Sequence, residues 1–359
     1  MRRVLRAIAT LLAVALGLEV GTRADEMVRL GTPFVSNASS IADIITIDSL
    51  GAHGNAGAQY RQFRFNSLGL RGPEPDPTLQ KILVLGASET FGLYEPSGKE
   101  YPRQLQDSLE AAGCRVQVLN AALPGFSLPT LSVSFRSRMR NLGASVVVLY
   151  PTPVQYLEAE RPVFRPHAAL KPDAPLTASL RAIVRLRDHV KAILPERVKT
   201  YLRSREIVAL RTQLGVAQWT SIPDDRVLAF HDDLAAFIDT LKASGLQPLV
   251  ATHANAFLPD APLDTARLVA WAKFYPHASM ELLPQFEKVA NTVIEQVAAE
   301  HGVPVSDVAA AMHAYNPDSV FADFSHFTSM GSARVAGVLS HDILASRGCP
   351  TRAAAGATR

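Results

Sequence analysis

Five short apolar runs alternate with longer amphipathic segments, and this alternation constrains the fold more than any other feature of the chain. The runs are near-continuous rather than alternating apolar and polar, as expected of strands that are covered on both faces. They are "KILVLG" at 81–86, "RVQVLN" at 115–120, "SVVVLYP" at 145–151, "LQPLVATH" at 246–253 and "VPVSDV" at 303–308. We therefore predict five strands of one parallel sheet.

The segments that separate these runs have apolar residues at helical spacing and end at glycines. They lie at 100–113, 129–143, 224–245, 280–302 and 328–348. Strands that alternate with helices favour a three-layer α/β fold with right-handed crossovers. A composition of 48% hydrophobic and 19% charged residues is that of a globular protein. The 36 Lys and Arg residues barely exceed the 33 Asp and Glu residues, so we expect no nucleic-acid partner.

The N-terminus has the pattern of an export signal, because three arginines precede a continuous apolar run from Ala7 to Leu18. No clean cleavage site of small residues follows, which favours a retained anchor. The apolar stretch 4–20 is short for a bilayer crossing and contains Arg6, which favours a cleaved signal. We predict that 1–22 is a signal anchor or a signal peptide. The body would then face the periplasm from the inner membrane, or be periplasmic or secreted after cleavage.

Two further segments depart from the alternation. Residues 23–75 form an N-terminal extension, and "YRQFRFNSLGLRGPEPDP" at 60–77 predicts a short hairpin or a lead-in strand. Residues 76–348 form the main domain, and 349–359 are predicted to be a disordered tail.

An insertion at 154–223 separates the third and fourth strands. It begins proline-rich and then becomes helical and basic from Leu180 to Leu214. Three interpretations are open. The insertion is a solvated helix pair, a positively charged cap for an anionic glycan, or a surface that lies against anionic lipid headgroups.

Polar and small residues follow the predicted strands, where open α/β sheets bind their ligands. They are "GAS" at 86–88, "NAALPGFS" at 120–127, "YPTPVQYL" at 150–157, "THANAF" at 252–257 and, before the last helix, "DFSHFTSMG" at 323–331. Nucleophilic catalysis needs a serine, an imidazole that takes its proton, a carboxylate that orients the imidazole, and donors for the oxyanion.

Ser88, His326 and Asp323 can supply these parts, and the N–H group of Gly125 can face a developing oxyanion. Ser88 begins a helix, whose N-terminus favours nearby negative charge. Asp323 and His326 are three residues apart in one loop. The alternatives are that Ser88 and Asp323 are only helix caps and that His326 fills space.

These motifs resemble the SGNH/GDSL serine hydrolases over about residues 64 to 345. "GASETFG" is similar to the first block of the family, "VLNAALPGFS" to the second and "DFSHFTSMGSARVA" to the last, although Ala87 stands where many members have aspartate. "FNSLGLRGPE" is similar to the segment before the nucleophile in many exported bacterial members. The resemblance implies a flavodoxin-like α/β/α fold, a Ser88–His326–Asp323 triad and an oxyanion hole that includes Ser88 and Gly125.

The third block departs from the family. The usual Gly-x-Asn-Asp is replaced by "YPTP", which puts Thr152 at about the place of the asparagine that donates to the oxyanion. Thr152 is either a substitute donor or a turn residue between two prolines. His253 and Asn255, at the end of the fourth strand, are expected either to bind substrate or complete the oxyanion hole, or to form a satisfied structural pair. No metal-ligand spacing and no Walker or dinucleotide fingerprint is present, so we expect no metal and no cofactor.

Cys114 and Cys349 follow the helix after the first strand and the last helix, respectively. Both helices begin at the predicted catalytic end of the sheet, so both cysteines lie at the opposite end. In a flavodoxin-like strand order they are neighbours, and we predict a disulfide between them. The alternative is two unrelated apolar residues.

The resulting expectation is an exported serine esterase that hydrolyses acyl esters, acetyl esters first among them, on a carbohydrate or a cell-envelope glycan. One alternative is a polysaccharide O-acyltransferase with the same triad, and another is a non-catalytic glycan-binding protein. The expected partners are an acylated carbohydrate or other small ester, the membrane through the N-terminal segment, and the envelope polysaccharide machinery.

Overall fold

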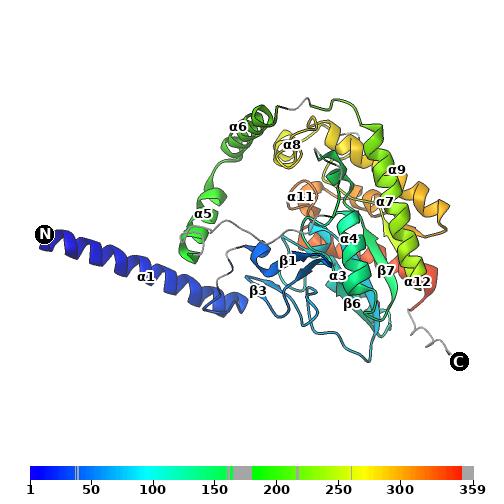
Figure 1. Cartoon of the computed structure of the whole chain (residues 1–359), viewed down its shortest axis with the longest axis horizontal. Helices are drawn as coiled ribbons and strands as arrows, with labels where there is room; N and C mark the ends of the chain where they lie inside the picture. The colour runs from blue at the N-terminus through cyan, green and yellow to red at the C-terminus, as the bar shows by residue number, and fades with distance from the viewer. Residues whose placement is uncertain are drawn as a thin grey trace.

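The structure is a computed structural model that describes residues 1–36, 38, 40–158, 160, 162–164, 180–215, 218–259 and 261–349. Most of the proline-rich start of the insertion, and the predicted tail from residue 350 onward, lie outside the described residues. Figure 1 shows a body built around one sheet, a long helix at the N-terminus that extends away from it, and a helical arm beside that helix.

The central sheet has five parallel strands in the order β6-β5-β7-β8-β9, which is the predicted flavodoxin-like arrangement. The strands are β5 (Gln80–Gly86), β6 (Val116–Asn120), β7 (Ala144–Tyr150), β8 (Gln247–Ala251) and β9 (Val305–Ser306). The chain runs from β5 to β6 on one side and then crosses to β7 on the other. The point at which the strand order reverses therefore lies at the carboxyl end of β5, where α/β sheets of this kind bind their ligands.

Helices cover both faces of the sheet, so the strands bury apolar side chains on both faces. Ile82 and Val84 of β5 pack into one core with helices α3 (Tyr101–Ala111), α10 (Val308–His313) and α12 (Ser329–Arg347). Leu83 and Leu85 pack into the other core with α4 (Leu128–Ser134), α7 (Asp224–Ala243) and α9 (Leu282–Glu300). The near-continuous apolar runs in the sequence follow directly from this three-layer arrangement.

The N-terminal extension supplies two short hairpins beside the sheet. The pair β3 (Gln59–Tyr60) and β4 (Phe63–Arg64) lies at the start of the segment where a hairpin was predicted. The pair β1 (Ile45–Asp48) and β2 (Gly51–Gly54) was not predicted. Phe63 packs against Phe91 of the short helix α2 (Ser88–Phe91), with ring centroids 5.3 Å apart. The extension therefore supports the turn that follows β5.

Several helices differ from the sequence-based expectation. The predicted helix 129–143 is α4 followed by a π-helical turn, η2 (Phe135–Met139). The basic segment forms two helices, α5 (Arg181–Ile193) and α6 (Glu196–Leu214), separated at Pro195. The short helices α8 (Thr265–Ala272) and α11 (Pro317–Val320) were not predicted.

The apolar N-terminal segment is part of helix α1 (Arg2–Leu30), which continues past the predicted boundary at residue 22. An ion pair between Arg23 and Glu19, with Nε and Oε1 2.6 Å apart, supports this continuation because residues four apart lie on one helix face. By length and composition, α1 is the one helix among the described residues that could cross a membrane.

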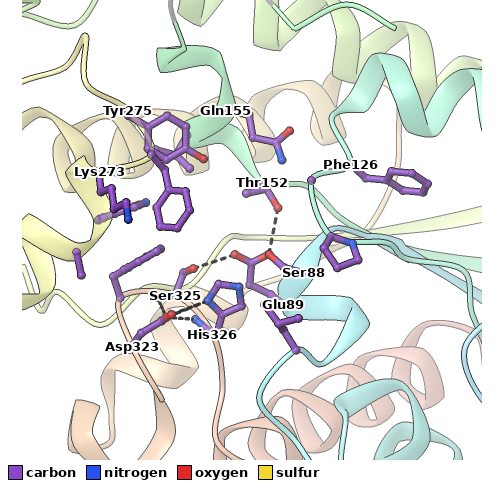
Figure 2. Close-up of a pocket in the computed structure, with 18 of the residues that line it drawn as sticks. Ser88, Glu89, Phe126, Thr152, Gln155, Lys273, Tyr275, Asp323, Ser325 and His326 are labelled. Carbon is purple, nitrogen blue, oxygen red and sulfur yellow. Dashed lines mark hydrogen bonds and ion pairs between the residues drawn. The ribbon is translucent and has the colours of Figure 1, made fainter. Parts of the chain in front are cut away.

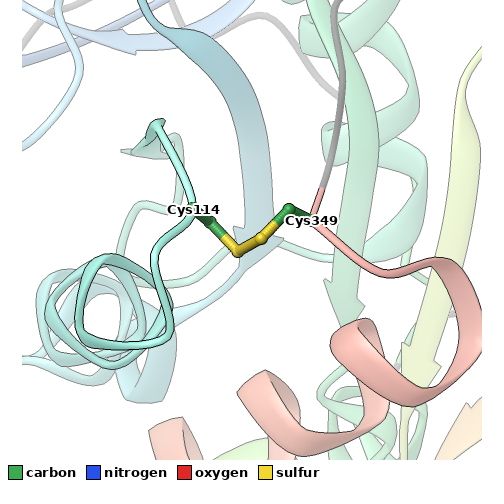
Figure 3. Close-up of a disulfide and its surroundings, with 2 residues drawn as sticks. All are labelled: Cys114 and Cys349. Carbon is green, nitrogen blue, oxygen red and sulfur yellow. A yellow bond between two sulfur atoms is a disulfide. The ribbon is translucent and has the colours of Figure 1, made fainter.

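A disulfide joins Cys114 to Cys349 at the end of the sheet opposite the predicted catalytic residues (Figure 3). The two Cα atoms are 5.2 Å apart, and the cysteines are separated by 235 residues in the sequence. Cys114 follows α3 and Cys349 follows α12, two helices that pack side by side. The pairing is the one expected from the positions of the two helices.

Candidate active site

An open pocket of about 1460 Å³ lies at the carboxyl end of the sheet. Five of the residues singled out from the sequence line it: Ser88, Gly125, Thr152, Asp323 and His326. Figure 2 shows four of these, Ser88, Thr152, Asp323 and His326, converging from separate segments of the chain. The fold therefore brings together residues that are up to some 240 positions apart in the sequence, as parallel strands with crossover connections do.

The turn after β5 requires a glycine. A Cβ atom on Gly86 would lie 2.0 Å from Thr90 Oγ1 and 2.9 Å from the Tyr150 carbonyl oxygen, so a larger residue would push α2 away from β7. Ser88 is the first residue of α2 and is half-buried at the pocket. Its hydroxyl donates a hydrogen bond to Glu89 Oε2 over 3.3 Å.

Asp323 holds His326 in a fixed orientation. The Nδ1 atom of His326 lies 3.0 Å and 2.9 Å from the two carboxylate oxygens of Asp323. Asp323 Oδ1 also accepts from the backbone N–H groups of Ser325 and His326, at 3.0 Å and 2.9 Å. Because Nδ1–H donates to the carboxylate, Nε2 is the unprotonated nitrogen of the neutral ring.

The Nε2 atom of His326 is buried and has no hydrogen-bond partner among the described residues. Tyr94 and Phe324 flank the ring, with centroids 5.0 Å and 5.9 Å away. Within the same residues, no hydrogen bond joins Ser88 to His326, since the Ser88 hydroxyl is turned to Glu89. An unpartnered buried acceptor beside a serine is a group that can accept a proton from it.

The net shift raises the pKa of His326 above its usual value. Burial alone lowers it, but the hydrogen bond that Nδ1–H donates to Asp323 and the negative charge of Glu89 favour the imidazolium more strongly. The pKa of Asp323 is lowered despite burial, because His326 and two backbone N–H groups stabilise its carboxylate. The pair is thus arranged to stabilise a proton on the imidazole.

Glu89 is a site residue that the sequence did not reveal. Its carboxylate is 3% exposed and accepts hydrogen bonds from Ser325 Oγ at 2.8 Å and Thr152 Oγ1 at 3.4 Å, besides that from Ser88. Burial raises the pKa of Glu89, but the nearby His253 outweighs it and the net shift is downward. In the sequence, an acidic residue at the start of a helix is interpreted as a helix cap. The contact of Glu89 with Ser325 depends on the fold.

His253 and Asn255 do not line the pocket, which differs from the expectation that they bind substrate. His253 is completely buried, with Nδ1 2.7 Å from Glu287 Oε2 and Nε2 3.8 Å from Glu89 Oε1. Burial lowers its pKa, yet the two carboxylates raise it to about 10. Asn255 accepts from the backbone N–H of Phe257 at 3.0 Å. His253 is thus held between two carboxylates in the interior, and Asn255 binds the backbone of its own loop, so neither side chain reaches the pocket.

The candidate oxyanion donors lie on two loops of the pocket. Gly125 has a φ of 82°, a left-handed conformation that strains other residues, so the loop after β6 needs glycine there. The Thr152 hydroxyl donates to Glu89, so it is not free to face an oxyanion in this state.

Gln155 was not singled out from the sequence. Figure 2 shows its amide on the Thr152 side of the pocket, and its buried Oε1 has no partner among the described residues.

The helical arm contributes the outer part of the pocket lining. Lys191 comes from α5, Lys199 and Arg203 come from α6, and Lys273 follows α8 and pairs with Glu206 of α6 at 3.1 Å. Phe274 adds an exposed aromatic ring. In the described part of the chain, no group of three or more His, Cys, Asp or Glu residues could hold a metal ion.

No protein-family model matches the chain, and no curated protein matches its sequence. Solved structures resemble it in shape. A lipase/acylhydrolase from Enterococcus faecalis is 16% identical and aligns over 76% of this chain and 100% of its own, with a TM-score of 0.46. Axe2, an acetylxylan esterase from Geobacillus stearothermophilus, is 12% identical over 74% of this chain and 94% of its own, with a TM-score of 0.43. Such low identities and TM-scores say nothing about this chain's reaction, which has to be inferred from its own residues.

Proposed function

We propose that the chain is a serine esterase of the SGNH type, with Ser88 as nucleophile, His326 as general base and Asp323 as the residue that orients His326. One observation carries the proposal: His326 binds Asp323 through Nδ1, while its Nε2 is buried without a described partner in the pocket that Ser88 lines. This is the arrangement of roles that serine nucleophiles need, whatever the fold.

In the proposed reaction, the Ser88 hydroxyl first rotates from Glu89 toward His326 Nε2. Its oxygen then attacks the ester carbonyl carbon as the proton passes to Nε2. The tetrahedral intermediate collapses, and His326 returns the proton to the leaving alcohol, which leaves an acyl group on Ser88. Water, deprotonated by His326, attacks this acyl-enzyme and releases the carboxylic acid and the free serine.

The oxyanion is assigned to the backbone N–H groups of Ser88 and Gly125, with the Gln155 amide as the side-chain donor in place of the family's asparagine. Gln155 is preferred to Thr152 because the Thr152 hydroxyl is engaged with Glu89. Glu89 has a separate proposed role. It positions Ser88, Thr152 and Ser325, and its charge helps His326 hold the proton.

The proposed substrate is an acyl ester, first of all an acetyl ester, on a carbohydrate outside the cytoplasmic membrane. The volume of the pocket is large for a small ester alone, and the exposed ring of Phe274 offers a surface on which a sugar can stack.

Export, with α1 retained as an anchor, is supported by the apolar helix and by the polar contacts that Glu19 and Glu26 make with α5.

The test is hydrolysis of acetyl esters by the purified full-length protein. Ser88→Ala should abolish turnover, and Ser108→Ala, which alters a serine on α3 away from the pocket, should leave it unchanged. A Ser88→Ala variant that keeps full activity would contradict the proposal. Adding glycan acceptors separates the two reactions of the same triad, because hydrolysis releases free acetate whereas transfer yields acetylated glycan.

A further inference from the structure

Helix α5 exposes an apolar stripe that the body of the protein does not cover. Ile183, Leu186, Val190 and Ile193 are 45%, 64%, 46% and 79% exposed. Their spacing of three, four and three residues places them on one face of the helix. The residues buried on α5, Arg181 and Val184, lie on the opposite side. An isolated exposed apolar residue is ordinary, but a continuous stripe indicates an interaction surface.

Cationic residues flank this stripe on both edges. At 100° per residue, Arg187 lies along one edge, with Lys191 further round toward the pocket, and Arg185 lies along the other edge. Arg187 is highly exposed. The one acidic residue of α5, Asp188, lies on the side away from the stripe, where it pairs with Arg61 of the N-terminal extension at 2.8 Å and more loosely with Arg187 at 3.8 Å. An apolar stripe bordered by cations is the pattern of a helix that lies in the interface of an anionic membrane.

The first turn of α5 is fixed to the part of α1 that follows its apolar segment. Arg181 Nη1 lies 3.0 Å from Glu26 Oε2, and both side chains are buried. Arg185 Nη1 lies 2.7 Å from Asp25 Oδ2. The backbone N–H groups of Arg181 and Ala182 donate to Glu19 at 3.1 Å and 3.0 Å. The apolar segment of α1 ends near residue 20, so α1 would leave a membrane at about this residue. Because the first turn of α5 contacts this part of α1, α5 lies at the level of the membrane surface.

The orientation of α5 agrees with this placement. Figure 1 shows α5 running across the direction of α1, between the apolar half of α1 and the body. Asp188, Lys191 and Ala192 line the pocket, so the stripe on the other side of α5 points away from the pocket. If α1 stands across a membrane, a helix that runs across its direction lies along the membrane surface.

We propose that α5 lies in the headgroup region of the membrane that α1 crosses. Ile183, Leu186, Val190 and Ile193 enter the acyl boundary, while Arg187 at the edge of the stripe contacts anionic phospholipids. This inference rests on α1 as a retained anchor and is independent of the proposed catalytic residues. It gives the basic insertion a function: it fixes the body at the membrane surface with the pocket open on the far side of α5.

The test places a fluorophore on the stripe of the full-length protein in lipid nanodiscs that contain phosphatidylglycerol. The described cysteines are paired in the disulfide, so Leu186→Cys supplies a thiol for an environment-sensitive label. The matched control is Leu228→Cys on α7, another exposed leucine but one remote from α1. Doxyl-labelled lipids should quench the label at residue 186 at least about twofold and leave the label at residue 228 unchanged.

A second variant tests this cation. Arg187→Glu should weaken quenching at residue 186 in phosphatidylglycerol nanodiscs, because a cation near an anionic surface contributes about a fivefold change in local binding. Equal quenching at residues 186 and 228 would overturn the proposal. A blue-shifted emission at residue 186 without lipid quenching would mean that a second copy of the chain covers the stripe, and would also overturn it.

Discussion

Two histidine–carboxylate clusters lie at the carboxyl end of the sheet, and they differ in one respect. His326 contacts Asp323 through Nδ1 and keeps Nε2 without a described partner beside the pocket. His253 has a carboxylate near each ring nitrogen, those of Glu287 and Glu89, and is completely buried. The comparison teaches that a buried histidine is a candidate base only where one nitrogen faces the substrate space. A neighbouring carboxylate alone does not distinguish a catalytic histidine from a structural one.

The first prediction breaks the His326 cluster. His326→Ala should lower kcat by about 10⁶-fold, because the serine loses the group that takes its proton. The unfolding midpoint should change little, since His326 borders an open pocket. Kinetics with an acetyl ester, together with thermal unfolding, checks both expectations. His341→Ala is the control, because His341 lies on α12 and is highly exposed. Full activity in His326→Ala would assign the base elsewhere.

The second prediction breaks the His253 cluster. His253→Ala should cost about 3–5 kcal/mol of unfolding free energy, because it leaves two buried carboxylates without their cation. The loss should be visible as a lowered midpoint in chemical denaturation, whereas activity per folded molecule should fall far less than in His326→Ala. A variant of normal stability that has lost all activity would instead place His253 in the catalytic machinery.

The third prediction concerns Glu89, which links the two clusters. His326 must be neutral to act as a base, and its raised pKa means that activity is lost as pH falls through a value higher than the pKa of an ordinary histidine. Glu89→Gln removes a negative charge that favours the imidazolium, so the acidic limb of the pH–rate profile should move to lower pH. The profile of kcat/KM against pH measures this shift.

A matched control for Glu89→Gln is Glu110→Gln on α3, which alters an exposed carboxylate remote from the pocket. Its acidic limb should coincide with that of the unaltered protein. If the limb of Glu89→Gln also stays in place, Glu89 does not act on the charge of His326 and serves only as a hydrogen-bond acceptor.

The smallest effect is expected at Thr152. Thr152→Val removes a long hydrogen bond to Glu89, so kcat/KM should fall by no more than about tenfold. A residue that donates directly to the oxyanion typically contributes about 10²–10³-fold in kcat. Parallel measurement of Thr152→Val and Gln155→Ala therefore decides which side chain donates to the oxyanion. The larger loss is expected for Gln155→Ala.

The sheet could be predicted from the sequence because burial on both faces leaves a local signal. Each of the five strands overlaps its predicted run, and the flavodoxin-like strand order matches. The hairpin of β1 and β2 left no such signal, since β2 is "GAHG", with few residues that favour strands. The basic segment was predicted to be helical from Leu180 to Leu214, with a helix pair as one interpretation, but the position of the break was not predicted. It lies at Pro195, which disfavours helix in the residue before it.

The site was predictable only where its residues form local motifs. Asp323 and His326 are three residues apart, so their pairing could be expected from one loop. Glu89 could not be assigned, because its partners Ser325 and His253 come from distant segments and their contacts depend on the sheet order. For the same reason, the sequence could not show whether His253 faces the pocket or Glu287.

The most direct measurement of the central claim is covalent labelling with a fluorophosphonate, which reacts with serines that a general base activates. The full-length protein is labelled, digested and analysed by mass spectrometry, in parallel with His326→Ala and His253→Ala. The account predicts a single adduct on Ser88, which His326→Ala abolishes and which the folded fraction of His253→Ala retains. An unlabelled Ser88, or labelling that persists in His326→Ala, would contradict it.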